Sequence, residues 1–541
     1  MPEYLAPGVF IEEIERGPKP IEGVATSTAA FLGECERGPT KPRFVSSYGE
    51  FLRLYGDVFG EGKYLAYSTK AFFDNGGRRA YIARVVGTDA ATSELNDQGY
   101  TIRALGPGIA GDRIWVRILA STTKVKPAPT GADPDPAPVP LGFRLQVAYW
   151  AREVPGGAFD PFLADNDERL PRPMIVEDYD DLSFDEESPS YWGKTISATT
   201  SALIDEIEVD PGATVPPDGD PPVPIISQTL VGGVEGAVPT EPQFGGLVDE
   251  NDTPIVDPTE FRGLAALDLD EYRDVAIVHA PGIGNDDDTT RSIQNAVVRH
   301  CERNRFRFAV LDSARNLNAV SDPRLSPRNF RDSQYAAFYY PWIYVPHPRT
   351  GVKTLIPPGG AACGIYALTD NTRGVWKAPA NVPVAGAIDL EYDINTARQE
   401  VLNPRGVNCI RRFPGRGIRM WGARTISSDP LWKYVSVRRL FIFLEASIYN
   451  STQWVVFEPN DQRLWARVQQ TITLFLRTQW REGALFGAKE EEAFSVSVGR
   501  GTMTEDDILN GRLIVEIGIA PVRPAEFVIF RVFQKTREAN S

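Results

Sequence analysis

Apolar strands and an amphipathic helix alternate in the middle of the chain. Residues 274–282 form a continuous apolar run that ends at a turn, residues 287–304 repeat apolar positions at helical spacing, and residues 306–313 form a second apolar run. Such runs predict strands that are covered on both faces, and the strand–helix–strand order predicts parallel strands joined by a right-handed crossover. This part of the chain therefore predicts an α/β domain.

The last third of the chain predicts a hairpin followed by two long helices. Residues 407–425 read as two strands with their turn at Pro414–Gly417, and helices are expected over residues 430–450 and 460–483. Asn460 or Asp461 is the expected cap of the second helix, and Gly483 ends it. One face of that helix carries an apolar stripe that we expect in the core: Leu464, Val468, Ile472, Phe475 and Leu476.

Both ends of the chain carry strand-like segments that are too apolar to lie in water. Residues 526–534 place Phe527, Ile529 and Phe533 on one face of a strand and Val528, Phe530 and Val532 on the other. Residues 8–14, with Val9, Phe10 and Ile11, show the same feature in milder form. Either these ends fold back onto their own domain, or each adds a strand to the sheet of a neighbouring molecule. The second alternative implies a polymer, because such a contact repeats without closing.

Charge and proline divide the chain further. The net charge is −15, but residues 153–270 contain 27 Asp and Glu against 4 Lys and Arg, which leaves the rest of the chain at about +8. Proline-rich stretches at residues 126–140 and 210–224 exclude helices and central strands there, so an acidic, turn-rich outer insertion is expected over residues 126–258. Residues 404–439 hold nine Lys and Arg against one Asp, and this segment either faces an acidic partner or pairs with acids of its own chain.

The chain shows little sign of enzyme chemistry. It contains no GxxxxGK[ST], HExxH or GxSxG motif, and its three histidines and four cysteines are scattered, so we expect no catalytic residue, no cofactor and no metal site. Asp286–Asp288 follow a strand but are expected to cap the next helix, His279 is expected to be a buried structural residue, and the cysteines are expected to be buried thiols. The alternative is a nucleotide- or metal-dependent α/β enzyme built on residues 274–313.

Two further classes are disfavoured by the pattern of apolar residues. No stretch approaches the ~18 uncharged apolar residues of a membrane span, so no membrane insertion by this chain is expected. The first residues, MPEYLAPGVFIEEIERG, lack the basic and apolar regions of a secretory signal, so secretion by a signal peptide is not expected.

Five segments of the chain point to one family: YLAPGVFIEEIERG at the N-terminus, FFDNGGRRAYIARV, IPPGGAACGIYALTDNTRG, residues 403–448 and the closing GRLIVEIGIAPVRPAEFVIFRVFQ. Together they resemble the contractile tail sheath proteins of phages and related contractile injection systems. The resemblance covers about residues 1–120 and 270–535. The family has a variable outer insertion, which corresponds to the middle segment that resembles nothing else.

The resemblance implies a multidomain, mixed α/β and α+β fold. A central α/β sheath domain would comprise residues 25–125 and 259–390, and a C-terminal α+β domain with the hairpin and long helices would comprise residues 391–524. A β-rich outer insertion would occupy residues 126–258. Extended arms would occupy residues 1–24 and 525–541, with Val9, Phe10, Ile11, Phe527, Val528, Ile529, Phe530 and Val532 as the strands that join subunits.

The resemblance also implies a mechanism and a set of partners. Copies of the chain would stack as hexameric rings, helically offset, around an inner tube protein, with a baseplate and a tail-terminator or cap protein at the ends and no direct binding of nucleic acid. The sheath would assemble in the bacterial or archaeal cytoplasm in a metastable extended state, then contract and drive the tube through a target envelope. The basic segment would face the tube through Arg411, Arg412, Arg416, Arg419, Lys433 and Arg438.

Overall fold

The computed structural model describes residues 20–127, 135–154, 161–162, 171–197, 199–219, 222–284 and 286–531. The chain divides into two compact units. The larger unit is Ala25–Arg438, and the smaller unit combines the described residues 20–24 with residues 439–531. Among the described residues, no helix has both the length and the apolar character needed to cross a bilayer.

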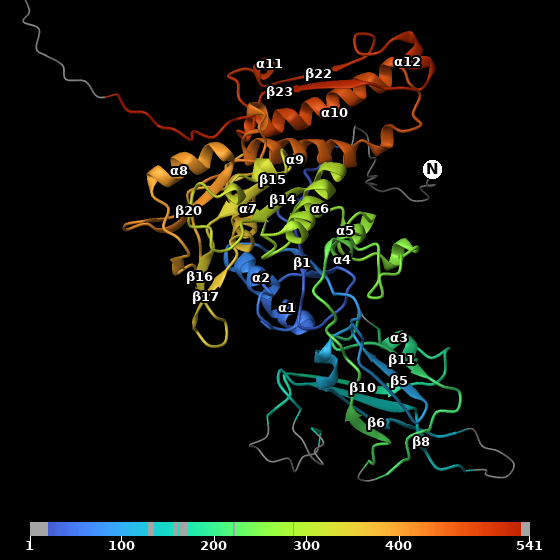
Figure 1. Cartoon of the computed structure of the whole chain (residues 1–541). Helices are drawn as coiled ribbons and strands as arrows, with labels where there is room; N and C mark the ends of the chain where they lie inside the picture. Colours follow the sequence, from blue (N-terminus) through green and yellow to red (C-terminus); the bar gives the residue numbers. More distant parts are fainter. Residues whose placement is uncertain are drawn as a thin grey trace, which may run out of the picture. The chain divides into compact units, whose positions relative to one another are not determined.

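A nine-stranded sheet forms the centre of the larger unit (Figure 1). Its strands lie in the order β18-β21-β20-β15-β14-β13-β1-β3-β2, with the pairs from β20 to β3 parallel and the outermost pairs antiparallel. Their bounds are β1 (Ala29–Gly33), β2 (Arg43–Val45), β3 (Ala80–Arg84), β13 (Ile277–His279), β14 (Phe308–Asp312), β15 (Ala336–Tyr340), β18 (Val382–Pro383), β20 (Val407–Phe413) and β21 (Gly417–Met420). Every residue of β1, β14 and β15 is buried, as the apolar runs predict.

Helices and a small sheet complete the central body around this sheet. The strand–helix–strand prediction is confirmed, because α6 (Asp288–Asn304) connects the parallel strands β13 and β14. The other elements are α1 (Tyr48–Tyr55), α2 (Leu65–Asp74), α4 (Glu241–Gly245), α5 (Gly263–Ala266), α7 (Gly359–Arg373), α8 (Thr396–Leu402) and the sheet of β16 (Ile343–Pro346), β17 (Lys353–Ile356) and β19 (Asp389–Leu390). The predicted hairpin at residues 407–425 is confirmed, and it extends the central sheet past residue 391 because β20 pairs with β15.

A β-sandwich forms the outer part of the larger unit. One sheet contains β10 (Ile175–Leu182), β9 (Phe143–Tyr149), β6 (Ile114–Ala120) and β12 (Ile226–Thr229), and the other contains β11 (Ile204–Val209), β5 (Tyr100–Ala104) and β4 (Glu94–Asp97). The short elements β7 (Lys124–Val125), β8 (Val139–Pro140) and α3 (Trp192–Thr195) lie at its periphery. Its core draws on Leu95, Tyr100, Ile114 and Ile118 as well as on residues 143–230, so the outer domain takes in strands that the sequence analysis placed in the central domain.

The outer domain leaves and rejoins the central body at adjacent residues. Ala91 and Val234 form an antiparallel bridge with N···O distances of 3.0 Å in both directions. Two buried arginines strengthen the junction. Arg37 donates to the Ala202 carbonyl at 3.1 Å, and Arg84 donates to the Pro107 carbonyl at 2.6 Å and the Gly38 carbonyl at 2.7 Å. The outer domain is therefore an insertion whose two connecting segments lie side by side.

The smaller unit contains the predicted pair of long helices and a two-stranded sheet. It includes most of α9 (Val435–Ser451), α10 (Gln462–Arg481), α11 (Glu490–Ala493), β22 (Phe494–Val498), α12 (Glu505–Leu509) and β23 (Val515–Ile519). Asp461 caps α10 by accepting from the N–H groups of Arg463 and Leu464, both at 2.9 Å, as predicted. The predicted apolar stripe of α10 is buried throughout, which confirms that helix and its core face.

The expectation of a multidomain, mixed α/β fold is confirmed. The two compact units and the outer sandwich each have their own sheet, and helices cover the central sheet (Figure 1). The four cysteines are buried and form no disulfide, as expected. Asp287 caps α6 by accepting from the Thr290 N–H at 2.8 Å, which confirms the capping role predicted for this acidic triplet.

Candidate assembly surfaces

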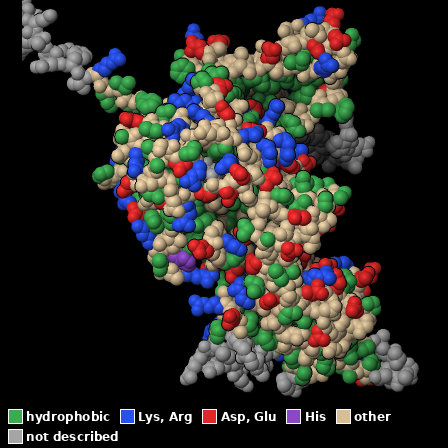
Figure 2. All heavy atoms as spheres, in the orientation of Figure 1, with side chains coloured by type: hydrophobic (Ala, Val, Ile, Leu, Met, Phe, Trp, Pro, Cys, Tyr) green, Lys and Arg blue, Asp and Glu red, His purple; other side chains and the backbone are tan. Residues whose placement is uncertain are grey.

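The C-terminal arm presents a row of exposed apolar side chains. Phe527, Val528, Ile529 and Phe530 are each at least 67% exposed, and the described residues 522–531 pair with no strand. Figure 2 shows this arm as a strip of hydrophobic side chains at the upper left. A segment with large side chains on both faces needs cover on both, and the described part of this single chain supplies none. Val9, Phe10, Ile11 and Val532 lie outside the described residues.

The sheet of β22 and β23 has two strands, and among the described residues no third strand pairs with either outer edge. The strands pair antiparallel from Phe494–Ile519 to Val498–Val515 and run alongside α10 (Figure 1). Their side chains alternate, with Phe494 buried and Ser495, Ser497, Glu516 and Gly518 exposed. A two-stranded sheet is only marginally stable by itself, and it gains from added strands. This sheet is therefore suited to accept an extended segment.

Three of the six basic residues in the predicted site share one face of the β20–β21 hairpin with two aromatic rings. Arg411 lies directly opposite Arg419, and Arg416 stacks 5.5 Å from the Phe413 ring and 5.8 Å from the Trp421 ring. Within the described part of the chain, none of these three guanidinium groups has a carboxylate partner. The face therefore combines uncompensated positive charge with aromatic surface.

Asn381 holds two of these arginines in place. Its side-chain oxygen accepts from Arg416 at 2.9 Å and from Arg419 at 3.3 Å, and its backbone carbonyl accepts from Arg419 at 2.8 Å. Asn381 has a φ of 60°, a left-handed conformation that asparagine tolerates better than most residues. Arg411 is likewise bound to neutral acceptors, the Ile394 carbonyl at 2.9 Å and the Gln399 side chain at 2.8 Å. The charges are positioned without being neutralised.

The other three basic residues of the predicted site differ in their surroundings. Arg412 projects to the opposite face of β20 and forms ion pairs with Asp389 and Asp393, so acids of its own chain compensate its charge. Lys433 lies 5.0 Å from the Tyr434 ring. Arg438 is only 3% exposed and stacks on Tyr335 and Trp432, at 4.8 and 4.6 Å, so its side chain belongs to the core of the larger unit.

Helix α10 carries a second basic surface that the sequence analysis missed. The helix contains four arginines and no Asp or Glu, and the arginines lie on its exposed side: Arg463, Arg467, Arg477 and Arg481. Arg467 stacks 4.0 Å from the Trp454 ring, and Arg477 is neutralised by a bidentate ion pair with Glu490 at 2.7 and 3.0 Å. The i, i+4 spacing of these arginines is visible in the sequence, but the sequence analysis used only the apolar stripe of this helix.

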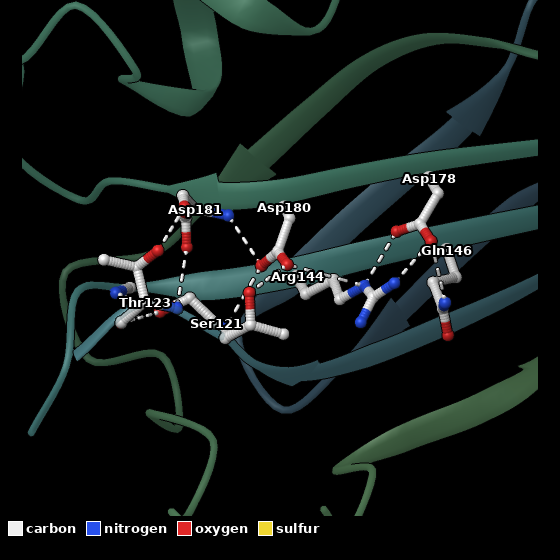
Figure 3. Close-up of polar contacts among 9 residues, drawn as sticks. Ser121, Thr123, Arg144, Gln146, Asp178, Asp180 and Asp181 are labelled. Carbon is white, nitrogen blue, oxygen red and sulfur yellow. Dashed lines mark hydrogen bonds and ion pairs between the residues drawn. The ribbon is translucent and has the colours of Figure 1, made fainter.

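The aspartates on β10 of the outer domain bond to groups within that domain. Figure 3 shows Arg144 forming a bidentate ion pair with Asp178, at 2.8 and 2.6 Å, and Asp181 accepting from the Thr123 hydroxyl at 2.6 Å and its N–H at 3.1 Å. The Arg144 guanidinium holds the pKa of Asp178 below its usual range. No group of three metal-ligating side chains occurs among the described residues. The aspartates on β10 therefore bond to side chains of the same domain. Their charges also disfavour the pairing of a further strand with β10, which lies at the edge of its sheet.

The carboxyl edge of the central sheet, where α/β enzymes bind ligands, is filled by side chains at β13 and β14. His279 and Asp312 are fully buried, with Nε2 and Oδ2 3.5 Å apart. Asp312 accepts from the N–H of Gly359 at 2.7 Å and of Gly282 at 3.0 Å, and burial raises the pKa of its carboxyl. A Cβ at Gly359 would lie 2.2 Å from the His279 ring, so the first turn of α7 closes on the pair. This confirms the structural role predicted for His279.

Comparisons with known proteins agree on one family. Residues 260–426 match the phage tail sheath protein central domain, and residues 427–535 match the phage tail sheath C-terminal domain. A prophage major tail sheath protein of Pseudomonas aeruginosa is 26% identical over 198 residues, which is 36% of this chain and 49% of the relative. A tail sheath protein of Burkholderia phage BcepMu is 26% identical over 159 residues, 28% of this chain and 33% of the relative. The chain thus spans half the length or less of these curated relatives.

Solved structures resemble the chain over nearly its whole length. The contracted sheath of the PVC extracellular contractile injection system has a TM-score of 0.57 at 22% identity and covers 99% of both chains. The contracted helical sheath of the anti-feeding prophage has a TM-score of 0.56 at 24% identity, with 98% of this chain and 99% of the other covered. At these identities the likeness concerns the fold alone.

Proposed function

We propose that this chain, which belongs to the phage tail sheath family, is the repeating subunit of a contractile sheath made of many copies of itself. It is a tail sheath structural protein of a contractile phage tail or injection system. Copies would stack as hexameric rings, helically offset, around a rigid inner tube. The observation that carries the proposal is the exposed apolar C-terminal arm, which fits no role in a lone subunit.

Each arm would add a strand to the β22–β23 sheet of a neighbouring copy. Main-chain hydrogen bonds would supply affinity. Alternate side chains of Phe527–Phe530 would be buried on the two faces of the enlarged sheet. The N-terminal arm, with Val9, Phe10 and Ile11, is proposed to act in the same way. Because donor and acceptor are different surfaces of one chain, the contact repeats and produces a continuous mesh instead of a closed dimer.

The energy for contraction would be stored in the packing of the subunits in the assembled sheath. Subunits would assemble in an extended, metastable arrangement held by the tube and the baseplate, and would relax into a shorter, wider arrangement that buries more surface. This conversion consumes no nucleotide. Contacts with the tube must then be weak enough to break during the stroke, which favours exposed charges over apolar surface.

The basic surfaces are proposed to face the acidic wall of the inner tube. On the β20–β21 hairpin the candidates are Arg411, Arg416 and Arg419, with Arg412 and Lys433 nearby. The arginines of α10 form a second candidate, since Arg463 and Arg481 have no ion pair within the described residues. Further proposed partners are baseplate proteins and a tail-terminator or cap protein, and the proposed place of assembly is the cytoplasm of a bacterial or archaeal cell.

Electron microscopy of the full chain, expressed alone and with its cognate tube protein, tests the proposal. We expect hollow cylinders of uniform width from the chain alone, or sheathed tubes when the tube protein is present. Discrete particles at every concentration, with and without the tube protein, would contradict it.

A further inference from the structure

The two edges of the β22–β23 sheet are not equivalent. In an antiparallel ladder, pairs whose backbone groups face each other alternate with pairs whose groups point away. The Ala520 N–H donates to the Ala493 carbonyl at 2.9 Å, just before the ladder begins at Phe494–Ile519. Backbone groups of Phe494, Val496 and Val498 therefore point to the outer edge of β22. Those of Val515, Ile517 and Ile519 point to the outer edge of β23.

A side chain of α10 already occupies one of these outward positions. The Gln469 amide donates from Nε2 to the Val496 carbonyl at 3.0 Å. The ladder register predicts independently that the Val496 carbonyl points away from β23, and the bond from Gln469 agrees with that direction. The bonded atom is the acceptor that the N–H of an added strand would need. Within the described residues, no side chain makes an equivalent bond to Ile517 on the other edge.

The helix holds Gln469 at this place. Its neighbours in the chain and on the next turn, Val468 and Ile472, are buried in the core of the smaller unit, and Asp461 caps the first turn. The adjacent Gln470 is exposed, and its side chain makes no hydrogen bond to any described residue. Gln469 thus reaches the edge of β22 from a rigid element, and Gln470 provides a natural comparison.

We propose that Gln469 guards the β22 edge and is displaced when the C-terminal arm of a second copy pairs there. This inference rests on the proposed function, because it concerns the regulation of the same strand addition. The arm is the fitting occupant, since it is extended, exposed and apolar on both faces. An arm arriving at β22 breaks the Gln469 bond and supplies its own N–H to Val496. The guard therefore raises the concentration at which free subunits polymerise, and so disfavours sheath that forms away from its template.

The test compares full-length Gln469→Ala with Gln470→Ala and the unaltered chain. One neutral hydrogen bond given up on strand addition corresponds to about a five-fold change in an equilibrium constant. We expect Gln469→Ala to lower the critical concentration for tube-free polymerisation about five-fold, measured by sedimentation, with Gln470→Ala unchanged. Equal thermal unfolding of the three proteins checks that the fold is intact. A critical concentration that Gln469→Ala leaves unchanged or raises overturns the guard.

Two outcomes separate the guard from the function on which it rests. If the unaltered chain forms no polymer with or without tube protein, the proposed function fails. If all three proteins polymerise at the same concentration, the sheath stands and only the guard fails. A photo-cross-linking residue in place of Ser497, on β22, identifies the occupant. Cross-links to residues 525–541 of another copy support the proposal, and cross-links confined to residues 1–19 overturn the assignment of the arm.

Discussion

Arg411 on β20 and Arg419 on β21 lie directly opposite each other across the hairpin, two like charges in one cross-strand pair. Such a pair opposes hairpin formation, since like charges at opposed positions repel. Neutral oxygens of Ile394 and Asn381 hold the two side chains in place, and neither has an ion pair within the described residues. An arrangement that costs stability in the subunit is expected where a residue serves a partner.

Arg419→Glu should therefore separate stability from assembly. A glutamate there faces Arg411 and lies near Arg416, so we expect the free energy of unfolding to stay level or rise by up to about 1 kcal/mol. Assembly around acidic tubes should fall, as measured by the sheathed fraction in electron micrographs. Arg412→Glu is the matched control, because it breaks the pairs with Asp389 and Asp393 and should lower stability instead. A loss of more than about 1 kcal/mol in Arg419→Glu would contradict the cost assigned to the pair.

The α10 surface should be distinguishable from the hairpin by salt. If Arg463 and Arg467 face the tube, the double change to glutamine should leave tube-free polymers intact while releasing tubes at lower ionic strength, because exposed ion pairs are screened. Arg477→Gln serves as the comparison, since Glu490 already neutralises that residue. If the ionic strength of tube release changes in the hairpin variants and stays the same in the α10 variants, the contact belongs to the hairpin alone.

Removing the C-terminal arm should abolish assembly without unfolding the subunit. Phe527, Val528, Ile529 and Phe530 are exposed, so a chain that stops at Pro524 should change the free energy of unfolding by less than about 0.5 kcal/mol. Light scattering should detect no polymer from this chain. As a finer test, Ile529→Ser should raise the critical concentration while leaving thermal unfolding unaltered. Normal cylinders from the truncated chain would refute the arm's role.

The outer domain should be removable only at its true boundaries. Replacing residues 92–233 by Asn-Gly joins Ala91 to Val234, which already form a bridge, and should leave a folded chain that polymerises. Deleting residues 126–258 instead removes β9 and β12 and exposes Tyr100, Val116 and Ile118. We expect that second chain to aggregate, as measured by its soluble yield. Aggregation of both would show that the central body needs the sandwich.

The cysteines should resist modification until the fold opens. Burial raises the pKa of the Cys301 and Cys409 thiols to about 12 and raises the pKa of Cys35 as well. The thiolate is the reactive form of cysteine, and burial disfavours it. A thiol reagent at pH 8 should label none of the four over minutes and all four in denaturant. Rapid labelling of the native chain would show that one of them is accessible.

The sequence predicts best those elements whose local pattern and tertiary role agree. Asp461 and the stripe from Leu464 to Leu476 define α10 completely, because cap, period and core face coincide in one segment. The hairpin at Pro414–Gly417 is equally local. The strand expected at residues 526–534 does not form in the described residues up to 531, because a strand needs a partner that the single chain does not provide.

Other features depend on contacts that no local pattern contains. The strands at residues 94–120 look like central strands, and only their pairing with β9, β11 and β12 places them in the outer sandwich. The charge count of residues 404–439 treats Arg416 and Arg438 alike. In the structure Arg416 is exposed and Arg438 is buried. The bond from Gln469 to Val496 joins a helix to a strand edge 27 residues away, and nothing in its sequence marks it.

The bridge between Ala91 and Val234 has a consequence for how such a protein can diversify. The path out to the sandwich begins where the path back ends, so a replacement for the span between them needs only to bridge this short distance and to offer acceptors to Arg37 and Arg84. A domain grafted at that spot must satisfy a single end-to-end distance, whatever its size. Longer loops cost little there, because loop closure grows only slowly with length. A lineage could thus exchange its outermost module by recombination while the machinery beneath it stays unaltered.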